Sequence, residues 1–159
     1  MRLLAALGIV MLAGTGMARG DDIVYWASHG TQWLAAGTTI AQLCSSNHED
    51  RVFGSQMFRS LAYTQAATEL LKLSTQQPRP RDRDADDGFP SGHAAFAFAF
   101  AETLSQHDSR WTIPAYTLAV VTGYQRIRDD GHYPLQVLAG AALGYFISQE
   151  VGKNQRWEW

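Results

Sequence analysis

The chain has 159 residues, a net charge of −2 and a mean hydropathy of −0.19. This near-neutral charge argues against a nucleic-acid partner, which needs a strongly basic surface. A single cysteine, Cys44, cannot form an internal disulfide, so the fold must be stabilised by packing. We expect Cys44 to be buried as a small apolar residue rather than to act as a nucleophile.

The first residues have the pattern of a secretory signal peptide. Arg2 precedes the apolar run LLAALGIVMLAG, and the small residues Gly16 and Ala18 precede a possible cleavage point. The run is shorter than the roughly 20 residues that span a bilayer. We therefore expect residues 1–18 to be a signal peptide and residues 19–159 to be one exported, periplasmic domain, soluble or membrane-peripheral. An uncleaved anchor is the alternative.

Five later segments carry apolar residues at helical spacing. In chain order, the spacing predicts helices over 24–43, 53–75, 91–105, 113–126 and 134–151. Proline residues punctuate the loops between them, and Pro114 suits a first helical turn. The run AFAFAF taken alone could be a strand, but no other segment has the alternating apolar and polar pattern that predicts strands. The sequence therefore predicts an all-α, single-domain bundle of about five to six helices.

Three basic residues stand near predicted helix ends. Lys72 lies close to the end of 53–75, Arg79 follows in the next loop, and Arg126 ends 113–126. Each alone is typical of a solvated surface charge. Together they could form an anion clamp, because the arginine fork matches phosphate oxygens and lysine adds a point charge.

The tetrapeptide PSGH, residues 90–93, opens the third predicted helix. Ser91 is a good N-cap residue, and Gly92 allows a ligand to approach the backbone. A helix N-terminus attracts anions, so this stretch could seat an anion beside His93. The alternative is a helix cap with an incidental histidine.

A second histidine, His132, also stands just before an apolar helix and close to basic residues. One histidine could attack phosphorus while the other protonates the leaving oxygen. A calcium loop at residues 82–93 is disfavoured, since Asp87 stands where glycine is required. Zinc is disfavoured because the two histidines have no third ligand at suitable spacing. We therefore expect no metal and no cofactor.

The motifs Lys72-x6-Arg79-Pro80, Pro90-Ser91-Gly92-His93 and Arg126-x5-His132 resemble the three-part signature of the type 2 phosphatidic acid phosphatase family. That superfamily includes bacterial non-specific acid phosphatases and vanadium haloperoxidases. The resemblance implies a metal-independent phosphatase in which His132 forms a phosphohistidine intermediate and His93 is the general acid. It also implies a phosphate-binding set made of Lys72, Arg79, Ser91, Gly92 and Arg126.

The sequence departs from the family pattern at two positions. Gln125 replaces a serine, and Gln136 stands where the family has the aspartate that orients the nucleophilic histidine. The i, i+4 spacing keeps Gln136 on the same helix face as His132. A glutamine can accept the same hydrogen bond but carries no charge, which weakens the interaction. Asp129 or Asp130 could instead supply a carboxylate.

Two functional hypotheses follow. The first is an exported phosphatase acting on a phosphomonoester or a lipid phosphate. The alternative is a weakened or inactive homologue that binds phosphate or lipid headgroups because Gln136 replaces the aspartate. A vanadate-dependent haloperoxidase is disfavoured by the small size of the chain. Trp157 and Trp159 in the tail could also contact a membrane interface.

Overall fold

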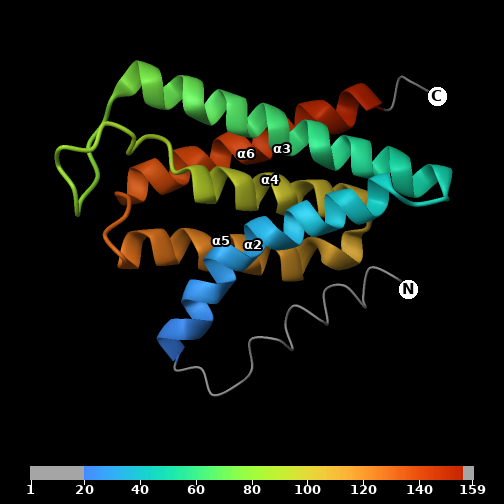
Figure 1. The fold of residues 1–159 in the computed structure, drawn as a ribbon, viewed down its shortest axis with the longest axis horizontal. Coiled ribbons are helices and arrows are strands. Elements are labelled where there is room, and N and C mark those ends of the chain that lie inside the picture. The colour runs from blue at the N-terminus through green and yellow to red at the C-terminus, as the bar shows by residue number, and fades with distance from the viewer. Residues whose placement is uncertain (1–19, 156–159) are drawn as a thin grey trace.

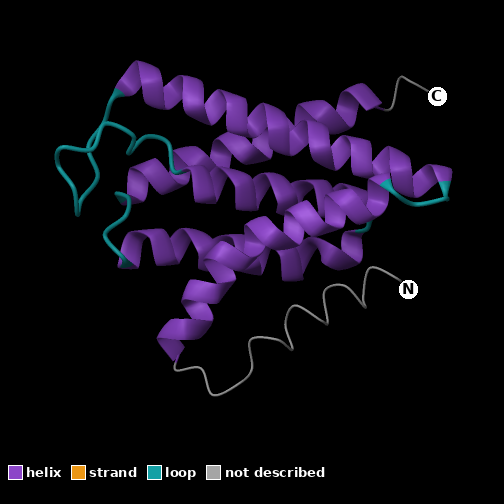
Figure 2. Cartoon of the chain, in the orientation of Figure 1, coloured by secondary structure: helices purple, strands orange, loops and turns teal. Residues whose placement is uncertain are grey.

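The computed structural model describes residues 20–155, and within them all regular structure is helical (Figures 1 and 2). The elements are α2 (Gly20–Leu43), α3 (His48–Thr75), α4 (Gly92–His107), the short 3-10 helix η1 (Ser109–Trp111), α5 (Thr112–Arg128) and α6 (Pro134–Gln155). The predicted all-α bundle is confirmed. The expected signal peptide and the two tail tryptophans, Trp157 and Trp159, lie outside the described residues.

All five predicted segments form helices, with shifted ends. The first two begin at Gly20 and His48 rather than at positions 24 and 53. The early start of α3 has a local cause, because the Asn47 side chain accepts a hydrogen bond from the backbone N–H of Glu49 over 3.1 Å. Such a cap satisfies an amide that would otherwise lack a partner at the first turn.

The central element is α4, which packs against α3, α5 and α6 (Figure 1). The run that could be read as a strand forms part of this helix, and its alanines, including Ala95 and Ala99, are buried. Small side chains on α4 let α6 approach closely through Gly144. A methyl group at Gly144 would lie 2.9 Å from the backbone nitrogen of Ala99, so the two helices leave no room for a side chain there.

The prediction that Cys44 is buried is wrong. Cys44 is exposed, because it immediately follows the last residue of α2 in the turn that leads into α3. The backbone N–H of Cys44 donates to the carbonyl of Ile40 over 3.0 Å, so this residue continues the helical hydrogen-bonding pattern without entering the core.

The bundle exposes large apolar side chains on several helices. Among them are Leu70 and Leu73 on α3 and Leu135 and Leu138 on α6, each about two-thirds exposed or more. We find no helix within residues 20–155 that has both the length and the apolar character needed to cross a membrane.

Two loops meet at one end of the bundle. The α3–α4 loop and the α5–α6 loop lie at the same end, whereas the α2–α3 loop lies at the other (Figure 2). A backbone hydrogen bond of 3.0 Å from the Arg81 N–H to the Asp130 carbonyl joins the two loops. The motifs singled out in the sequence are thereby brought to this end of the molecule.

Candidate active site

His132 is held by two acceptors at the start of α6. Its Nδ1 lies 2.9 Å from the carbonyl oxygen of Gly88 and 3.3 Å from Oε1 of Gln136. Because a carbonyl oxygen only accepts hydrogen bonds, Nδ1 carries the proton and Nε2 keeps its lone pair. His132 is 3% exposed, so these protein contacts orient its ring.

The end of α5 positions the backbone of His132. The carbonyl of Arg126 accepts hydrogen bonds from the N–H groups of Gly131 and His132, each over 3.0 Å. These two bonds close the loop between the two motif residues, so the spacing between Arg126 and His132 follows from a compact turn. The Arg126 side chain folds over the same turn, since a methyl group at Gly131 would lie 2.8 Å from its guanidinium.

The N-terminus of α4 is anchored to α6. The N–H of Ser91 donates to the carbonyl of Gln136 over 2.9 Å. Ser91 occupies the predicted N-cap position, but its hydroxyl makes no capping bond; it is buried and has no partner within residues 20–155. The ammonium of Lys72 lies beside Gly92, 3.7 Å from where a methyl group would be. His93 follows in the first turn and is half-buried.

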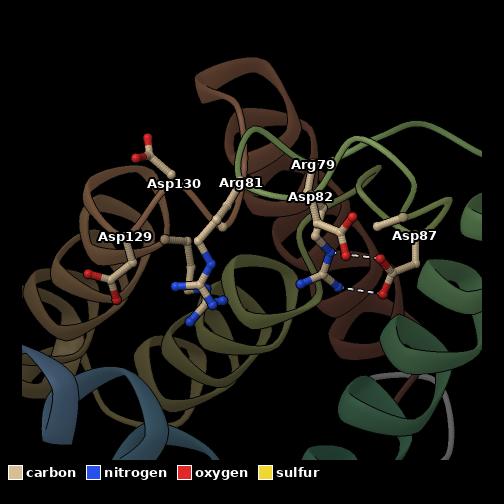
Figure 3. Close-up of a pocket in the computed structure, with 9 residues that line it drawn as sticks. Arg79, Arg81, Asp82, Asp87, Asp129 and Asp130 are labelled. Atoms are coloured by element: carbon tan, nitrogen blue, oxygen red, sulfur yellow. Dashed lines mark hydrogen bonds and ion pairs between the residues drawn. The ribbon is translucent and has the colours of Figure 1, made fainter.

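A cavity of about 770 Å³ opens between the two loops (Figure 3). Arginine and aspartate side chains dominate its lining. In the view of Figure 3, Asp129 and Asp130 lie at one end and Asp87 at the other, with Arg79 and Arg81 between them. The lining residues are Arg79, Arg81, Asp82, Ala85, Asp87, Arg126, Asp129, Asp130 and Gly131.

Two of the predicted cationic residues are engaged by carboxylates of the chain. Arg79 forms a bidentate ion pair with Asp87, in which Nε donates to Oδ1 over 2.7 Å and a terminal nitrogen donates to Oδ2. Lys72 contacts Glu69 over 3.0 Å on the same helix. Both carboxylates are about half exposed, so a phosphate could replace them without leaving a buried charge unpaired.

Burial and neighbouring charges lower the pKa values of two basic groups, His132 and Arg126. The pKa of the His132 imidazole is lowered mainly by burial, with further lowering from the cations Arg79 and Arg126. Burial also lowers the pKa of Arg126, whose Nε has no partner in the fold. His132 is therefore biased toward its neutral form, and the buried Nε of Arg126 is a donor without a partner among the described residues.

The structure thus brings Arg79 and Arg126 into one cavity, while Lys72, Ser91, Gly92 and His93 gather at the α4 N-terminus. Asp129 does not replace the missing carboxylate, since it accepts from Gln125 over 3.1 Å. Sequence reasoning missed Arg81, Asp87 and Gly88. The first two stand in a charged loop whose path the sequence does not define, and the third acts through its backbone.

A helical bundle that collects these three basic and histidine-bearing motifs at one end is the architecture of the phosphatidic acid phosphatase class. The chain belongs to the PAP2 superfamily, whose family model matches residues 54–157. The resemblance seen in the sequence is confirmed. The crystal structure of Aquifex aeolicus LpxE has the same fold, with a TM-score of 0.71 and 21% identity over 92% of this chain and 94% of that one.

Curated relatives share shorter segments. Lipid A 1-phosphatase of Porphyromonas gingivalis is 38% identical over 82 residues, which are 49% of this chain and 18% of the relative. Lipid phosphate phosphatase gamma of Arabidopsis thaliana is 34% identical over 105 residues, which are 55% of this chain and 46% of the relative. Undecaprenyl-diphosphatase of Sulfolobus acidocaldarius is 37% identical over 73 residues, which are 45% of this chain and 34% of the relative. The chain therefore spans less than half the length of each of these relatives, all of which are named as phosphatases.

Proposed function

We propose that this protein is a metal-independent phosphatase that hydrolyses the phosphomonoester of a lipid phosphate through a phosphohistidine intermediate. The observation that carries the proposal is the hydrogen bond of His132 Nδ1 to a carbonyl oxygen, which leaves Nε2 as the nucleophilic atom. Family membership and the phosphatase names of the relatives support the reaction class, and two lipid phosphatases among them support the substrate class.

In the first step, the Nε2 lone pair of His132 attacks phosphorus and the bond to the leaving oxygen breaks. The electron pair of that bond goes to the leaving oxygen, which takes a proton from the His93 imidazolium. In the second step, His93 accepts a proton from water, the water oxygen attacks phosphorus, and the N–P bond breaks. The products are the alcohol and inorganic phosphate, and both histidines return to their starting states.

The basic residues would stabilise the charge that develops on the phosphoryl oxygens. Arg79 and Arg126 face the cavity, and Lys72 lies beside Gly92 at the N-terminus of α4. The buried Ser91 hydroxyl and the buried Arg126 Nε have no hydrogen-bond partner among the described residues, so a phosphoryl oxygen that reached them could accept from both. Such preorganised donors supply most of the catalysis in phosphoryl transfer, because little covalent chemistry is needed from the protein.

The test uses the purified chain with phosphatidic acid and p-nitrophenyl phosphate. We expect turnover without added metal, loss of turnover in His132→Ala, and radiolabelled phosphate retained on the protein under alkaline quench. The matched control is His48→Ala, because His48 is an exposed histidine at the far end of the bundle. Turnover that survives His132→Ala would refute the mechanism. Absence of turnover with retained vanadate binding would favour the phosphate-binding alternative.

We also propose that the site end of the bundle contacts a membrane surface. Leu73 and Leu135 are 73% and 71% exposed, and each is next in sequence to a residue of the candidate site. Leu70 and Leu138 are also exposed, on α3 and α6, two helices that pack against each other. Exposed apolar groups around a polar cavity would bring lipid phosphates to the arginines.

Vesicle sedimentation tests this contact. We expect the chain to bind phosphatidylcholine vesicles that contain phosphatidic acid, and Leu73→Ser with Leu135→Ser to weaken binding while p-nitrophenyl phosphate hydrolysis is kept. Ile113→Ser is the control, because Ile113 is 80% exposed but lies at the start of α5, away from the site. Equal vesicle binding by all variants would refute this surface.

Export of the protein is a further part of the proposal. It rests on the signal-peptide pattern of residues 1–18, and lipid phosphates in an outer leaflet or envelope would then be accessible. Cell fractionation and N-terminal sequencing test it. We expect a periplasmic product that begins after Ala18, and recovery in the cytoplasm with an intact Met1 would contradict export.

A further inference from the structure

A single glycine in the α3–α4 loop lies against the proposed nucleophile. The Gly88 carbonyl oxygen is 2.9 Å from Nδ1 of His132, whereas Gln136 Oε1 is 3.3 Å away. We propose that the Gly88 backbone carbonyl is the principal acceptor that positions His132, and that Gln136 acts mainly as a clamp that holds the Gly88 loop in place. This inference rests on the proposed role of His132 as nucleophile and assigns Gly88 and Gln136 as positioning residues.

The hydrogen bonds of the Gln136 amide fix its orientation. Its Nε2 donates to the carbonyl of Pro78 over 3.0 Å, and its Oε1 accepts from the Tyr133 N–H over 3.1 Å. An amide turned the other way would place an N–H against the Tyr133 N–H and an oxygen against the Pro78 carbonyl. Oε1 therefore faces His132 but is already engaged, which agrees with its longer distance to Nδ1.

The surroundings of Gly88 show why this carbonyl is well placed. A methyl group at Gly88 would lie 2.7 Å from the carbonyl oxygen of Gln77, 2.8 Å from Nε2 of Gln136, and still closer to the carbonyl of Pro78. The Gly88 N–H also donates to Gln77 over 2.7 Å. Glycine is required here by lack of space rather than by an unusual φ, since the described glycines have no positive φ.

The same contacts explain how this chain accommodates glutamine where the family has aspartate. The Pro78 carbonyl needs a donor, and a carboxylate at position 136 would present an acceptor in its place. Aspartate is also one methylene shorter, so it would reach neither Pro78 nor the position of Oε1 in the same way. Gln136 is thus matched to the loop that carries Gly88, and the neutral Gly88 carbonyl takes over the contact to Nδ1.

The direct test weakens the carbonyl itself. Incorporating the α-hydroxy analogue of phenylalanine at position 89 converts the Gly88–Phe89 amide to an ester, whose carbonyl is a poorer acceptor. We expect kcat to fall about three- to tenfold with KM unchanged, and the Nδ1–H proton resonance of His132 to move upfield. An ester at the Ser45–Ser46 linkage, in the loop at the other end of the bundle, is the matched control.

Two substitutions of Gln136 complete the test. Gln136→Met removes all three side-chain hydrogen bonds, to His132, Tyr133 and Pro78, at similar size. We expect the nitrogen shifts of His132 to show that the Nδ1–H tautomer is kept while kcat falls. Gln136→Asp should bring no gain in kcat. The inference is overturned if the ester at Gly88 changes neither kcat nor the resonance, if Gln136→Met switches the tautomer, or if Gln136→Asp raises kcat.

The tautomer measurements separate this inference from the proposed function. They need no turnover, so they report on Gly88 even in a chain without phosphatase activity. A wild type that is inactive but keeps Nδ1–H against the Gly88 carbonyl would refute the proposed function and leave the positioning role standing. An active wild type whose Nδ1–H tautomer depends on Gln136 alone would support the proposed function and refute the positioning role of Gly88.

Discussion

Arg79 and Asp87 form a bidentate ion pair that spans the α3–α4 loop, and Asp87 is followed directly by the glycine that contacts His132. The hydrogen bond from Arg79 lowers the pKa of the Asp87 carboxyl, so this group is charged at neutral pH. Asp87 therefore binds the guanidinium nitrogens of Arg79 that would contact phosphate in the proposed mechanism. The carboxylate competes with phosphate for Arg79.

Substituting this carboxylate should strengthen phosphate binding. In Asp87→Asn, the amide oxygen can still accept from Arg79 and keep its orientation, but the competing charge is lost. We expect the Kd for inorganic phosphate, measured by titration calorimetry, to fall about two- to tenfold. The size is modest because the Asp87 side chain is 44% exposed and the pair is screened by solvent.

Asp82→Asn is the control for this prediction. Asp82 lines the same cavity and carries the same charge, but its side chain accepts from the Asp84 N–H rather than from an arginine. An equal fall in the Kd for phosphate in both variants would mean that the overall charge of the cavity, rather than the Arg79–Asp87 pair, controls phosphate binding. Weaker phosphate binding in Asp87→Asn would mean that Asp87 mainly orients Arg79.

The buried His132 should make the stability of the fold depend on pH. Burial, with Arg79 and Arg126 nearby, lowers its pKa below the ordinary 6.5, so the unfolded chain takes up a proton first as the pH falls. Above pH 6.5 the imidazole is neutral in both states and has no effect. Stability is then lost from about pH 6.5 down to the lowered pKa, with a slope of at most about 1.4 kcal/mol per pH unit.

Urea unfolding at pH 8, 7, 6 and 5 measures this slope. We expect His132→Asn to flatten the loss of unfolding free energy between pH 7 and 5, because asparagine does not titrate. Asp87 does not interfere in this range, since its pKa is lowered from 3.8. A slope that is the same in wild type and His132→Asn would show that other groups cause the acid sensitivity.

Sequence patterns predicted the helices well because each depends on local spacing. The pairing of His132 with Gln136 was also predictable, since residues four apart share a helix face. The contact between Gly88 and His132 was not, because it joins a backbone oxygen to a side chain 44 positions away. Sequence spacing carries no information on such a contact until the path of the loop is known.

The polar loop residues show the same limit. Arg79 was singled out by its motif, but its partner Asp87 stood among several similar aspartates with nothing to distinguish it. Ser91 was predicted as an N-cap from its type and position. The position is right, yet the hydroxyl is buried without a protein partner, because the α4 N-terminus packs on α6 through the Ser91 backbone.

The contact between α4 and α6 predicts a large difference between two glycines. Gly144→Ala would place a methyl group 2.9 Å from the Ala99 nitrogen and closer still to the Ala95 carbonyl, so the helices must separate. We expect a loss of about 1–3 kcal/mol in unfolding free energy. At Gly37 in α2, an added methyl group would meet no described residue within 4 Å, so Gly37→Ala should instead gain about 0.4–1 kcal/mol. Chemical denaturation of both variants checks this, and similar midpoints would contradict the close helix contact.

A buried carboxylate in the second half of α4 gives the last prediction. Glu102 is 5% exposed and accepts hydrogen bonds from the side chains of Tyr116, Gln106 and Gln149. It lies ten residues from the start of α4, about 15 Å along the helix, so it is remote from the candidate site.

Tyr116→Phe would remove the donor to Oε2 and leave a buried charge with fewer partners. We expect a loss of about 1.5–3 kcal/mol in unfolding free energy with kcat and KM unchanged, because hydrogen bonds to a charged group are the stronger kind. Tyr124→Phe is the control, since Tyr124 is on the same helix but 60% exposed. Altered kinetics at full stability would instead link this network to the site.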